Sequence, residues 1–207
     1  DLGGDISAGG GRLMDKDQLV REIRCRAKDT LFPDGNSYRA IFLRDVLSLG
    51  TVTGVHGKEI EIASLENGII PKRYARNFNT FSIEDQLRLL RSNVAVVGLG
   101  GLGGGVLEIL ARIGIGSLVL IDGDRFEETN LNRQVTSGQS SISMPKATAA
   151  AKRIYEINSS IQIRTHKFFL DEQNAEDLLA DADVIVDCLD SIKTRFIVEK
   201  AAKKLDT

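Results

Sequence analysis

The sequence is poor in cysteine, has no excess of basic residues and contains no long hydrophobic run, and each shortage excludes a class of protein. Only Cys25 and Cys188 occur in 207 residues, which gives neither a disulfide framework nor a zinc-binding pattern. The net charge is -2 and no aromatic residues interleave with basic runs, so no nucleic-acid partner is expected. No apolar stretch reaches the roughly 18 residues of a membrane-spanning helix, and the first residues do not read as a signal peptide. We therefore expect a protein of the reducing cytoplasm, without a membrane partner.

The remaining composition, 42% hydrophobic and 27% charged, is typical of a globular protein with one large domain and a smaller appendage. Residues 1–13 are rich in glycine and lack periodicity, and we expect them to be disordered. Residues 14–70 show helical spacing and predict a small helical appendage. Residues 71–207 predict an α/β domain.

Apolar spacing in the appendage predicts three helices. The first is expected over residues 15–29, the second over residues 38–49 and the third over residues 51–68. A hairpin turning at His56 is the alternative for the first half of the third. Pro71 should stop any helix that reaches it.

Strands and helices alternate strictly after a helix expected over residues 82–92. Continuous apolar strands with helical crossovers are typical of a parallel sheet covered on both faces, so we expect a Rossmann-like, doubly wound fold. The strands are expected at residues 93–98, 117–122, 161–166 and 183–188, and the helices at residues 101–114, 145–158, 174–180 and 191–205. Such a sheet would normally continue past its fourth strand, so the C-terminal part of the fold is expected to be missing.

A glycine-rich turn follows the first of these strands. Gly98, Gly100 and Gly103 form the pattern G-x-G-x-x-G at the mouth of a helix. These glycines allow a sharp turn, close approach of a phosphate to the backbone, and packing of the helix on the strand. The amino terminus of the helix then offers free N–H groups to the phosphate. Asp122 ends the next strand, where an acid can bind ribose hydroxyls. The motif predicts a nucleotide, and it fits NAD as well as ATP.

The long loop between the second strand and its helix favours a triphosphate. Loops of about twenty residues in a compact domain are usually functional, and this one carries Asn130, Arg133 and Lys146. A triphosphate attacked at its α-phosphorus needs such groups, because charge gathers on its oxygens in the transition state. The alternative for Arg133 and Lys146 is a solvated surface pair.

Asp190 stands at the tip of the fourth strand, beside the first, where open α/β sheets place their ligands. A carboxylate facing phosphates would repel them unless a divalent cation lay between. Asp190 is therefore expected to hold Mg²⁺. The alternative is that Asp190 or Ser191 caps the helix that follows.

Together these motifs resemble the ThiF/MoeB/HesA family, the prokaryotic relatives of ubiquitin-activating enzymes. RYARN resembles the family's R-Y-x-R-Q element, and LIDGDRFEETNLNRQ resembles its D-x-D-x-V-x-x-x-N-L-x-R-Q segment. VDCLDS resembles D-x-x-D-N. Asn77 stands where the family has glutamine, and Ser191 stands where it has asparagine.

The resemblance implies an adenylyltransferase that uses ATP and Mg²⁺. Its substrate would be the C-terminal glycine carboxylate of a small ubiquitin-like sulfur-carrier protein ending in Gly-Gly, of the ThiS/MoaD type used in thiamine or molybdopterin biosynthesis. Arg76 would be lent to the other subunit's site in a homodimer, and any structural zinc would lie in the missing C-terminal part. The residues implied for nucleotide and metal are Gly98, Gly100, Gly101, Gly103, Asp122, Asp124, Asn130, Arg133, Lys146, Asp190 and Ser191.

Two other functions stay open on the sequence. The same glycine turn would serve an NAD(P)-dependent oxidoreductase, although no His, Tyr or Lys is obviously placed for hydride transfer. A non-catalytic module that senses a nucleotide is the third possibility, with the appendage recognising a partner through a helix-turn-helix-like pair. Cys188 ends an apolar strand and is expected to be a small buried hydrophobic residue.

Overall fold

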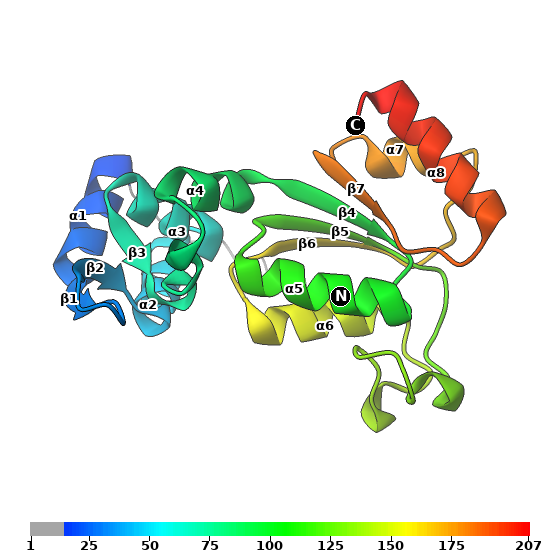
Figure 1. The fold of residues 1–207 in the computed structure, drawn as a ribbon, viewed down its shortest axis with the longest axis horizontal. Helices are drawn as coiled ribbons and strands as arrows, with labels where there is room; N and C mark the ends of the chain where they lie inside the picture. The colour runs from blue at the N-terminus through cyan, green and yellow to red at the C-terminus, as the bar shows by residue number, and fades with distance from the viewer. Residues whose placement is uncertain (1–14) are drawn as a thin grey trace, which may run out of the picture. The chain divides into compact units, whose positions relative to one another are not determined.

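The computed structural model describes residues 15–207, and the chain divides into two compact units, Asp1–Arg73 and Tyr74–Thr207 (Figure 1). The boundary predicted from the sequence lies three residues earlier. The disorder expected for residues 1–13 lies outside the described residues. Within residues 15–207, no helix is both long and apolar enough to cross a membrane.

The first unit combines three helices with a small sheet that the sequence did not predict. Strands β1 and β2 are antiparallel, whereas β2 and β3 are parallel, in the order β1-β2-β3. Aliphatic side chains from all three helices and two of the strands form its core. The elements are α1 (Lys16–Arg26), β1 (Lys28–Leu31), β2 (Ser37–Ile41), α2 (Leu43–Thr53), α3 (Gly57–Glu66) and β3 (Ile69–Pro71).

A β-hairpin overturns parts of the first two predicted helices. The helix expected over residues 15–29 ends at Arg26, and the one expected over residues 38–49 begins only at Leu43. Between them the N–H of Phe32 donates to the carbonyl of Asn36 (2.9 Å) and closes a tight turn. The rings of Phe32 and Tyr38 stack with centroids 3.9 Å apart. A Pro-Asp-Gly turn and an aromatic pair across it outweigh the weaker helical spacing of these residues.

The third predicted helix is also interrupted, and its hairpin alternative is wrong. Helix α2 ends at Thr53 and is followed by its C-cap Gly54, whose φ of 72° is left-handed, and α3 begins after its N-cap His56. The chain therefore turns between two helices at this point. On α3, Glu61 is fully buried, and its carboxylate lies 3.4 Å from Nε of Arg73.

The second unit is a parallel, doubly wound sheet, as the sequence predicted. The strand order is β6-β5-β4-β7, and every neighbouring pair is parallel. Each α-helix and β-strand of this unit lies within one residue of its predicted bounds. The elements are α4 (Ile83–Arg91), β4 (Asn93–Val97), α5 (Gly101–Ile113), β5 (Ser117–Ile121), α6 (Lys146–Ile157), β6 (Gln162–His166), α7 (Ala175–Leu179), β7 (Val184–Asp187) and α8 (Ile192–Leu205).

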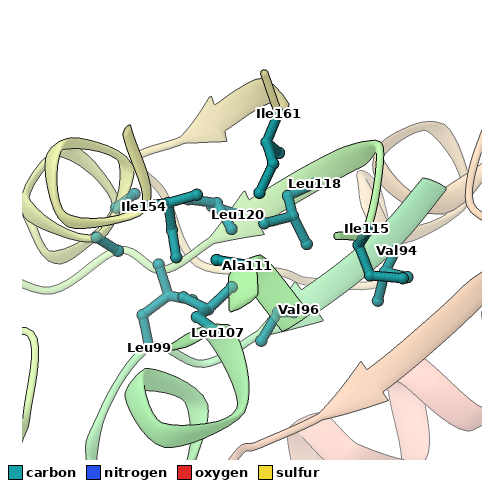
Figure 2. Packing of buried hydrophobic residues seen from close by; sticks show 12 residues of the cluster. Val94, Val96, Leu99, Leu107, Ala111, Ile115, Leu118, Leu120, Ile154 and Ile161 are labelled. Carbon is teal, nitrogen blue, oxygen red and sulfur yellow. The ribbon is translucent and has the colours of Figure 1, made fainter. Parts of the chain in front are cut away.

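Alternate residues of the central strands supply two separate cores, as expected for a sheet covered on both faces. On β4, Val94 and Val96 pack with α5 and α6 (Figure 2), whereas Ala95 and Val97 pack with α7 and α8. Figure 1 shows these two helix pairs on opposite faces of the sheet.

This topology fixes where a ligand can bind. The crossovers from β4 to β5 and from β5 to β6 use the face of α5 and α6, and the connection to β7 uses the other face. From β4 the chain adds β5 and β6 on one side of the sheet and then β7 on the other, so the strand order switches between β4 and β7. Open α/β sheets bind ligands beside such a switch point, at the carboxyl ends of their strands. Gly98 and Cys188 follow these two strands, and Cys188 N–H donates to the carbonyl of Val97 (2.8 Å).

Tyr74 fastens the segment before α4 to the far end of the unit. Its side chain is 1% exposed, and its hydroxyl accepts a hydrogen bond from Nδ2 of Asn158 (2.9 Å), the residue that ends α6. The ring also packs against Gly114, which ends α5 with a φ of 92°. A side chain at Gly114 would therefore meet both the ring and an unfavourable backbone conformation.

Gly114→Ala should destabilise the protein strongly. The added Cβ would lie 2.6 Å from the Tyr74 ring and 2.8 Å from Nε2 of Gln86, both of which are buried. Overpacking together with a left-handed φ should cost at least about 2 kcal/mol in free energy of unfolding. Urea denaturation measures the change. Gly105→Ala is the matched control within α5, where a Cβ meets nothing within 4 Å, and it should raise stability by about 0.5–1 kcal/mol. Equal effects of the two substitutions would contradict the packing described here.

Candidate active site

A cavity of about 430 Å³ opens at the carboxyl edge of the parallel sheet. Residues after β4, β5, β6 and β7 line it, together with the first turns of α5 and α8. Of the residues predicted to bind nucleotide or metal, all except Gly103 and Asn130 line this cavity. Those that line it are Gly98, Gly100, Gly101, Asp122, Asp124, Arg133, Lys146, Asp190 and Ser191.

The glycine turn gives the cavity its floor. Gly98 has a φ of 89°, and a Cβ there would lie 2.9 Å from the carbonyl oxygen of Cys188. A Cβ at Gly103 would lie 1.9 Å from the carbonyl oxygen of Gly98, so this glycine lets α5 begin directly against the strand end. Gly103 thus shapes the turn without reaching the cavity. The free N–H groups of the first turn of α5 are left for an anion.

Asp122 joins the glycine turn to the next strand. Its Oδ2 accepts a hydrogen bond from the N–H of Leu99 (2.7 Å), and its Oδ1 accepts one from the N–H of Asp124 (2.8 Å). Each carboxylate oxygen retains a second lone pair that faces no other partner in the described residues. The side chain therefore fixes two backbone segments of the cavity, in addition to the ribose contact that we predicted for it.

The predicted cations reach the cavity from the long loop and the helix behind it. Lys146 opens α6 and is 8% exposed, and its Nζ lies 3.0 Å from Oδ2 of Asp124. Lys146 is therefore a buried, paired cation, and the solvated surface pair is wrong for it. Arg133 is exposed, and its Nη1 donates to the carbonyl of Thr129 (2.8 Å) and to Oδ1 of Asn132 (2.9 Å).

Asn130 lies behind the cavity and holds the loop together. Its side chain is 9% exposed, and Oδ1 accepts a hydrogen bond from the N–H of Glu127 (2.9 Å). The carbonyl of Asn130 also accepts the N–H of Arg133 (3.2 Å). In this structure Asn130 orients the segment that carries Arg133, and it does not line the cavity itself.

Beyond β7, Ser191 and not Asp190 caps helix α8. Ser191 is the N-cap of α8, and its Oγ accepts a hydrogen bond from the N–H of Thr194 (3.4 Å). Within residues 15–207 the exposed carboxylate of Asp190 forms no hydrogen bond and no ion pair. The turn itself is held by Asp187, which accepts from the N–H of Leu189 (2.9 Å) and from Nε of Arg195 (2.8 Å).

Gln134, Phe169 and Cys188 are among the lining residues that were not predicted as site residues. Gln134 is buried beside the glycine turn, and Phe169 is 67% exposed with its ring 2.8 Å from where a Cβ of Gly123 would stand. The glycine between Asp122 and Asp124 was the only sequence signal for this close approach. Cys188 also lines the cavity and is half-buried. Burial, and then the neighbouring Asp187, raise the pKa of its thiol, so Cys188 is not an activated nucleophile.

Arg76 lies at the other end of α5 from the cavity. The neighbouring Asn77 donates through Nδ2 to Oε1 of Gln86 (2.8 Å) and to the carbonyl of Ile113 (3.1 Å), the last residue of α5. The cavity is built on the first turn of the same helix, and thirteen residues of α-helix are about 20 Å long. Asn77 is therefore an anchor of this segment and does not contact a base in its own unit.

Comparisons with known proteins find similar proteins over most of the chain. The model of the ThiF family matches residues 74–207. The chain is 37% identical over 135 residues to the adenylyltransferase and sulfurtransferase MOCS3 of Drosophila persimilis, covering 64% of this chain and 30% of that protein. It is 35% identical over 133 residues to the SAMP-activating enzyme E1 of Haloferax volcanii, covering 63% of this chain and 49% of that protein. The structure of E. coli tRNA N6-threonylcarbamoyladenosine dehydratase, TcdA, in complex with ATP matches with a TM-score of 0.63 and 26% identity, over 65% of this chain and 56% of that chain.

Asp122→Asn should weaken the two hydrogen bonds that hold the glycine turn and the start of the long loop against β5. An amide presents only one acceptor, so one of the two backbone N–H groups now facing the carboxylate would meet an N–H donor instead. We expect a loss of about 1–3 kcal/mol in the free energy of unfolding, measured by urea denaturation. Glu172→Gln is the control: it removes the same negative charge from an exposed side chain of the same unit, and it should leave the free energy of unfolding unaltered. Equal unfolding curves for both variants would show that the Asp122 hydrogen bonds do not hold the site.

Proposed function

The chain belongs to the ThiF family, and from this premise we propose that it adenylates a carboxylate. It would bind ATP, attack its α-phosphate with the C-terminal glycine carboxylate of a small ubiquitin-like or sulfur-carrier protein, and release pyrophosphate. The family match confirms the resemblance drawn from the sequence motifs. The names of the relatives, an adenylyltransferase and a SAMP-activating enzyme, support this reaction type. The chain spans 30% and 49% of their lengths.

One observation carries the proposal: cations and a free carboxylate converge on a phosphate-binding turn. Lys146 and Arg133 line the same cavity as Gly100 and Gly101, and Asp190 also lines it, without a partner among the described residues. A ligand with several negative charges satisfies both the helix terminus and the cations. A dinucleotide's two phosphates would be served by the turn alone.

The chemistry that these residues must perform is charge neutralisation and positioning. The attacking carboxylate is already ionised at neutral pH, so no general base is required. The negative charge of the pentavalent transition state would be offset by Lys146, by Arg133 and by the N–H groups at the start of α5. The turn, held by Asp122, would keep the α-phosphate in line with the incoming carboxylate.

The residues present fit a magnesium ion bound through the nucleotide. Among residues 15–207 no cluster of three metal-binding side chains exists, which argues against a metal held by protein ligands alone. Mg²⁺ is commonly held by one or two carboxylates together with substrate phosphates, and the exposed, unpaired Asp190 is such a carboxylate. When bound there, Mg²⁺ would supply positive charge to the phosphates.

The other two functions have less support. Among the described residues that line the cavity there is no histidine or tyrosine to serve hydride transfer, and the thiol of Cys188 is held protonated. In the appendage, residues Ile60 to Leu65 of α3 are all buried, so this helix does not offer a face for a nucleic-acid groove. A sensor that binds nucleotide without turnover is separated from an enzyme by the assay below.

Arg76 would act in the site of a second subunit. Its segment is fixed at the carboxyl end of α5 through Tyr74 and Asn77, whereas the cavity lies at the amino end. The exposed guanidinium forms no bond with the described residues and is free to contact a partner. We therefore propose a homodimer in which each subunit completes the other's site.

Exchange of radiolabelled pyrophosphate into ATP tests the proposed reaction. We expect exchange that requires Mg²⁺ and a carrier protein ending in Gly-Gly, and none when the terminal carboxylate is amidated. Exchange supported instead by a tRNA with a carboxylate-bearing modification would keep the ATP chemistry and replace the substrate. Binding of Mg·ATP without exchange for any carboxylate would favour the sensor. Tighter binding of NAD than of ATP, insensitive to Mg²⁺, would contradict the proposal.

Arg76→Ala should lower adenylation about 100-fold or more while leaving ATP affinity nearly unchanged, because the contact matters most in the transition state. The readouts are pyrophosphate exchange and calorimetric titration with Mg·ATP. Arg88→Ala, at another exposed arginine, on α4, is the control and should have little effect on either.

Mixing Arg76→Ala with Asp190→Ala should recover activity if Arg76 acts across a dimer. Each hybrid dimer then holds one site with both residues intact, and random pairing restores about a quarter of wild-type activity. Labelled subunits would first establish that exchange occurs. No recovery despite subunit exchange would place Arg76 in its own subunit's site or in none.

A further inference from the structure

Helix α5 carries an apolar stripe along its outer side. Leu102 is 65% exposed, Ile109 is 62% exposed, and Val106 lies half-buried between them. An α-helix has about 3.6 residues per turn, so residues at positions i, i+4 and i+7 lie on one face. The outer face of a surface helix is normally polar. A continuous apolar stripe there indicates an interaction surface.

The charged residues of α5 lie on another side of the helix. Glu108 pairs with Arg112 (3.2 Å) and with Arg153 of α6 (2.6 Å), so this side faces α6. Gly105 lies within the stripe, and a Cβ there would meet nothing within 4 Å. The stripe is therefore apolar and open, and at Gly105 the backbone of α5 can be approached closely by another helix.

The positions of the cavity and of Arg76 indicate that the stripe is covered by a second copy of the chain. The cavity is built on the first turn of α5. At the other end of the helix, Asn77, which follows Arg76, donates to the carbonyl of Ile113 (3.1 Å). A two-fold axis perpendicular to α5 would pack two copies of the helix antiparallel, because it exchanges their ends. Each Arg76 would then lie beside the end of α5 that carries the partner's cavity.

The same two-fold axis would bury the stripe against itself. The middle of the stripe falls between Gly105 and Val106. An axis at this point makes Leu102 of one copy face Ile109 of the partner subunit, and it makes Gly105 face Val106 of the partner subunit. Large and small apolar side chains then meet across the contact, as close packing of two helices requires.

This register also brings Arg76 to the partner's glycine turn. Ile113 lies four residues beyond Ile109, and Gly98 lies four residues before Leu102. When Leu102 and Ile109 face each other, Ile113 therefore faces Gly98 of the partner subunit. The axes of packed helices are about 8–10 Å apart, a gap that the side chain of an arginine beside Ile113 can span. A single contact thus accounts for both the exposed stripe and the distance of Arg76 from its own cavity.

We propose that the outer face of α5 is the interface of a homodimer, in which two copies of α5 pack antiparallel with Leu102 of each against Ile109 of the partner subunit. This inference rests on the proposed function, in which Arg76 acts in the site of a second subunit. It adds which surface joins the two subunits and how they are oriented.

Ile109→Arg should prevent dimer formation, because it would bury an unpaired charge in an apolar contact. Analytical ultracentrifugation should show a dimer for the wild type and a monomer for the variant at the same concentration. Ile109 does not line the cavity, so the variant should bind Mg·ATP as the wild type does. Its pyrophosphate exchange should fall about 100-fold, as expected for the loss of Arg76 from the partner's site.

Phe196→Arg is the matched control for this substitution. Phe196 is 65% exposed and lies on α8, which covers the opposite face of the sheet (Figure 1). The control variant should remain a dimer and keep its activity. Dissociation of the dimer by Phe196→Arg but not by Ile109→Arg would place the interface on α8 and overturn the proposal.

Cysteine cross-linking tests the antiparallel register. The background is Cys25→Ser, which removes an exposed native thiol. A mixture of Leu102→Cys and Ile109→Cys subunits should form a disulfide-linked dimer, because the facing Cα atoms would lie within the roughly 4.4–6.8 Å that a disulfide spans. Each variant alone should give little cross-linked dimer, since two copies of the same position are about 10 Å apart along the axis. Efficient cross-linking of each variant alone would show parallel helices and contradict the proposal.

The outcomes separate this interface from the function on which it rests. A wild-type dimer that Ile109→Arg leaves intact would overturn the interface, whatever the result of pyrophosphate exchange. A monomeric wild type that still catalyses exchange would overturn the interface and the homodimer but not adenylation. A monomer that loses its affinity for the carrier protein through Ile109→Arg would make the stripe a docking site for the carrier, and the inference would again fail. A cross-linked dimer without exchange for any carboxylate would support the interface and contradict the proposed reaction. Thermal melting of each variant establishes that it is folded.

Discussion

The carboxylate of Asp122 is the constraint on which the arrangement of the site depends. It sits at the carboxyl end of β5 and accepts hydrogen bonds from the N–H of Leu99, in the glycine turn, and from the N–H of Asp124, at the start of the long loop. A neighbouring strand thus fixes both the glycine turn and the base of the loop that carries Arg133. Backbone hydrogen bonds to a carboxylate are charge-assisted and directional, which suits a site that must be formed before its ligand arrives.

An aspartate at the end of β7 also accepts a hydrogen bond from a backbone N–H two residues later, but the next acid after it is not paired. Asp187 accepts from the N–H of Leu189, as Asp122 accepts from the N–H of Asp124. After Asp122, the next acid, Asp124, is paired with Lys146 across 3.0 Å. After Asp187, the next acid is Asp190, which has no partner among residues 15–207. Asp124 orients the buried Lys146, whereas Asp190 remains unpaired among the described residues. Two similar strand ends therefore place a paired carboxylate after β5 and an unpaired one after β7.

The sequence predicted the second unit well because its signals are local. Apolar strands of four or five residues, glycines at strand ends and the cap at Ser82 each act within a few residues. The first unit depended on contacts that periodicity does not encode, such as the stacking of Phe32 on Tyr38 that closes the hairpin. The anchoring of Tyr74 on Asn158 spans 84 positions, and the isolation of Gln134 is visible only in three dimensions. A sequence motif identifies which residues gather in a site, but it does not show which of them are already paired.

In the homodimer that we propose, the pairing of the cations would give a reason for an arginine from outside the subunit. Lys146 shares its charge with Asp124, and the Nη1 of Arg133 is held by the loop through Thr129 and Asn132. Paired cations are rigid and well placed, but part of their field is cancelled before any nucleotide binds. In the proposed reaction, a triphosphate and an attacking carboxylate would bring further negative charge into this cavity. An unpaired guanidinium on a rigid segment, as Arg76 is, would add charge only when two subunits meet, and so would couple activity to assembly.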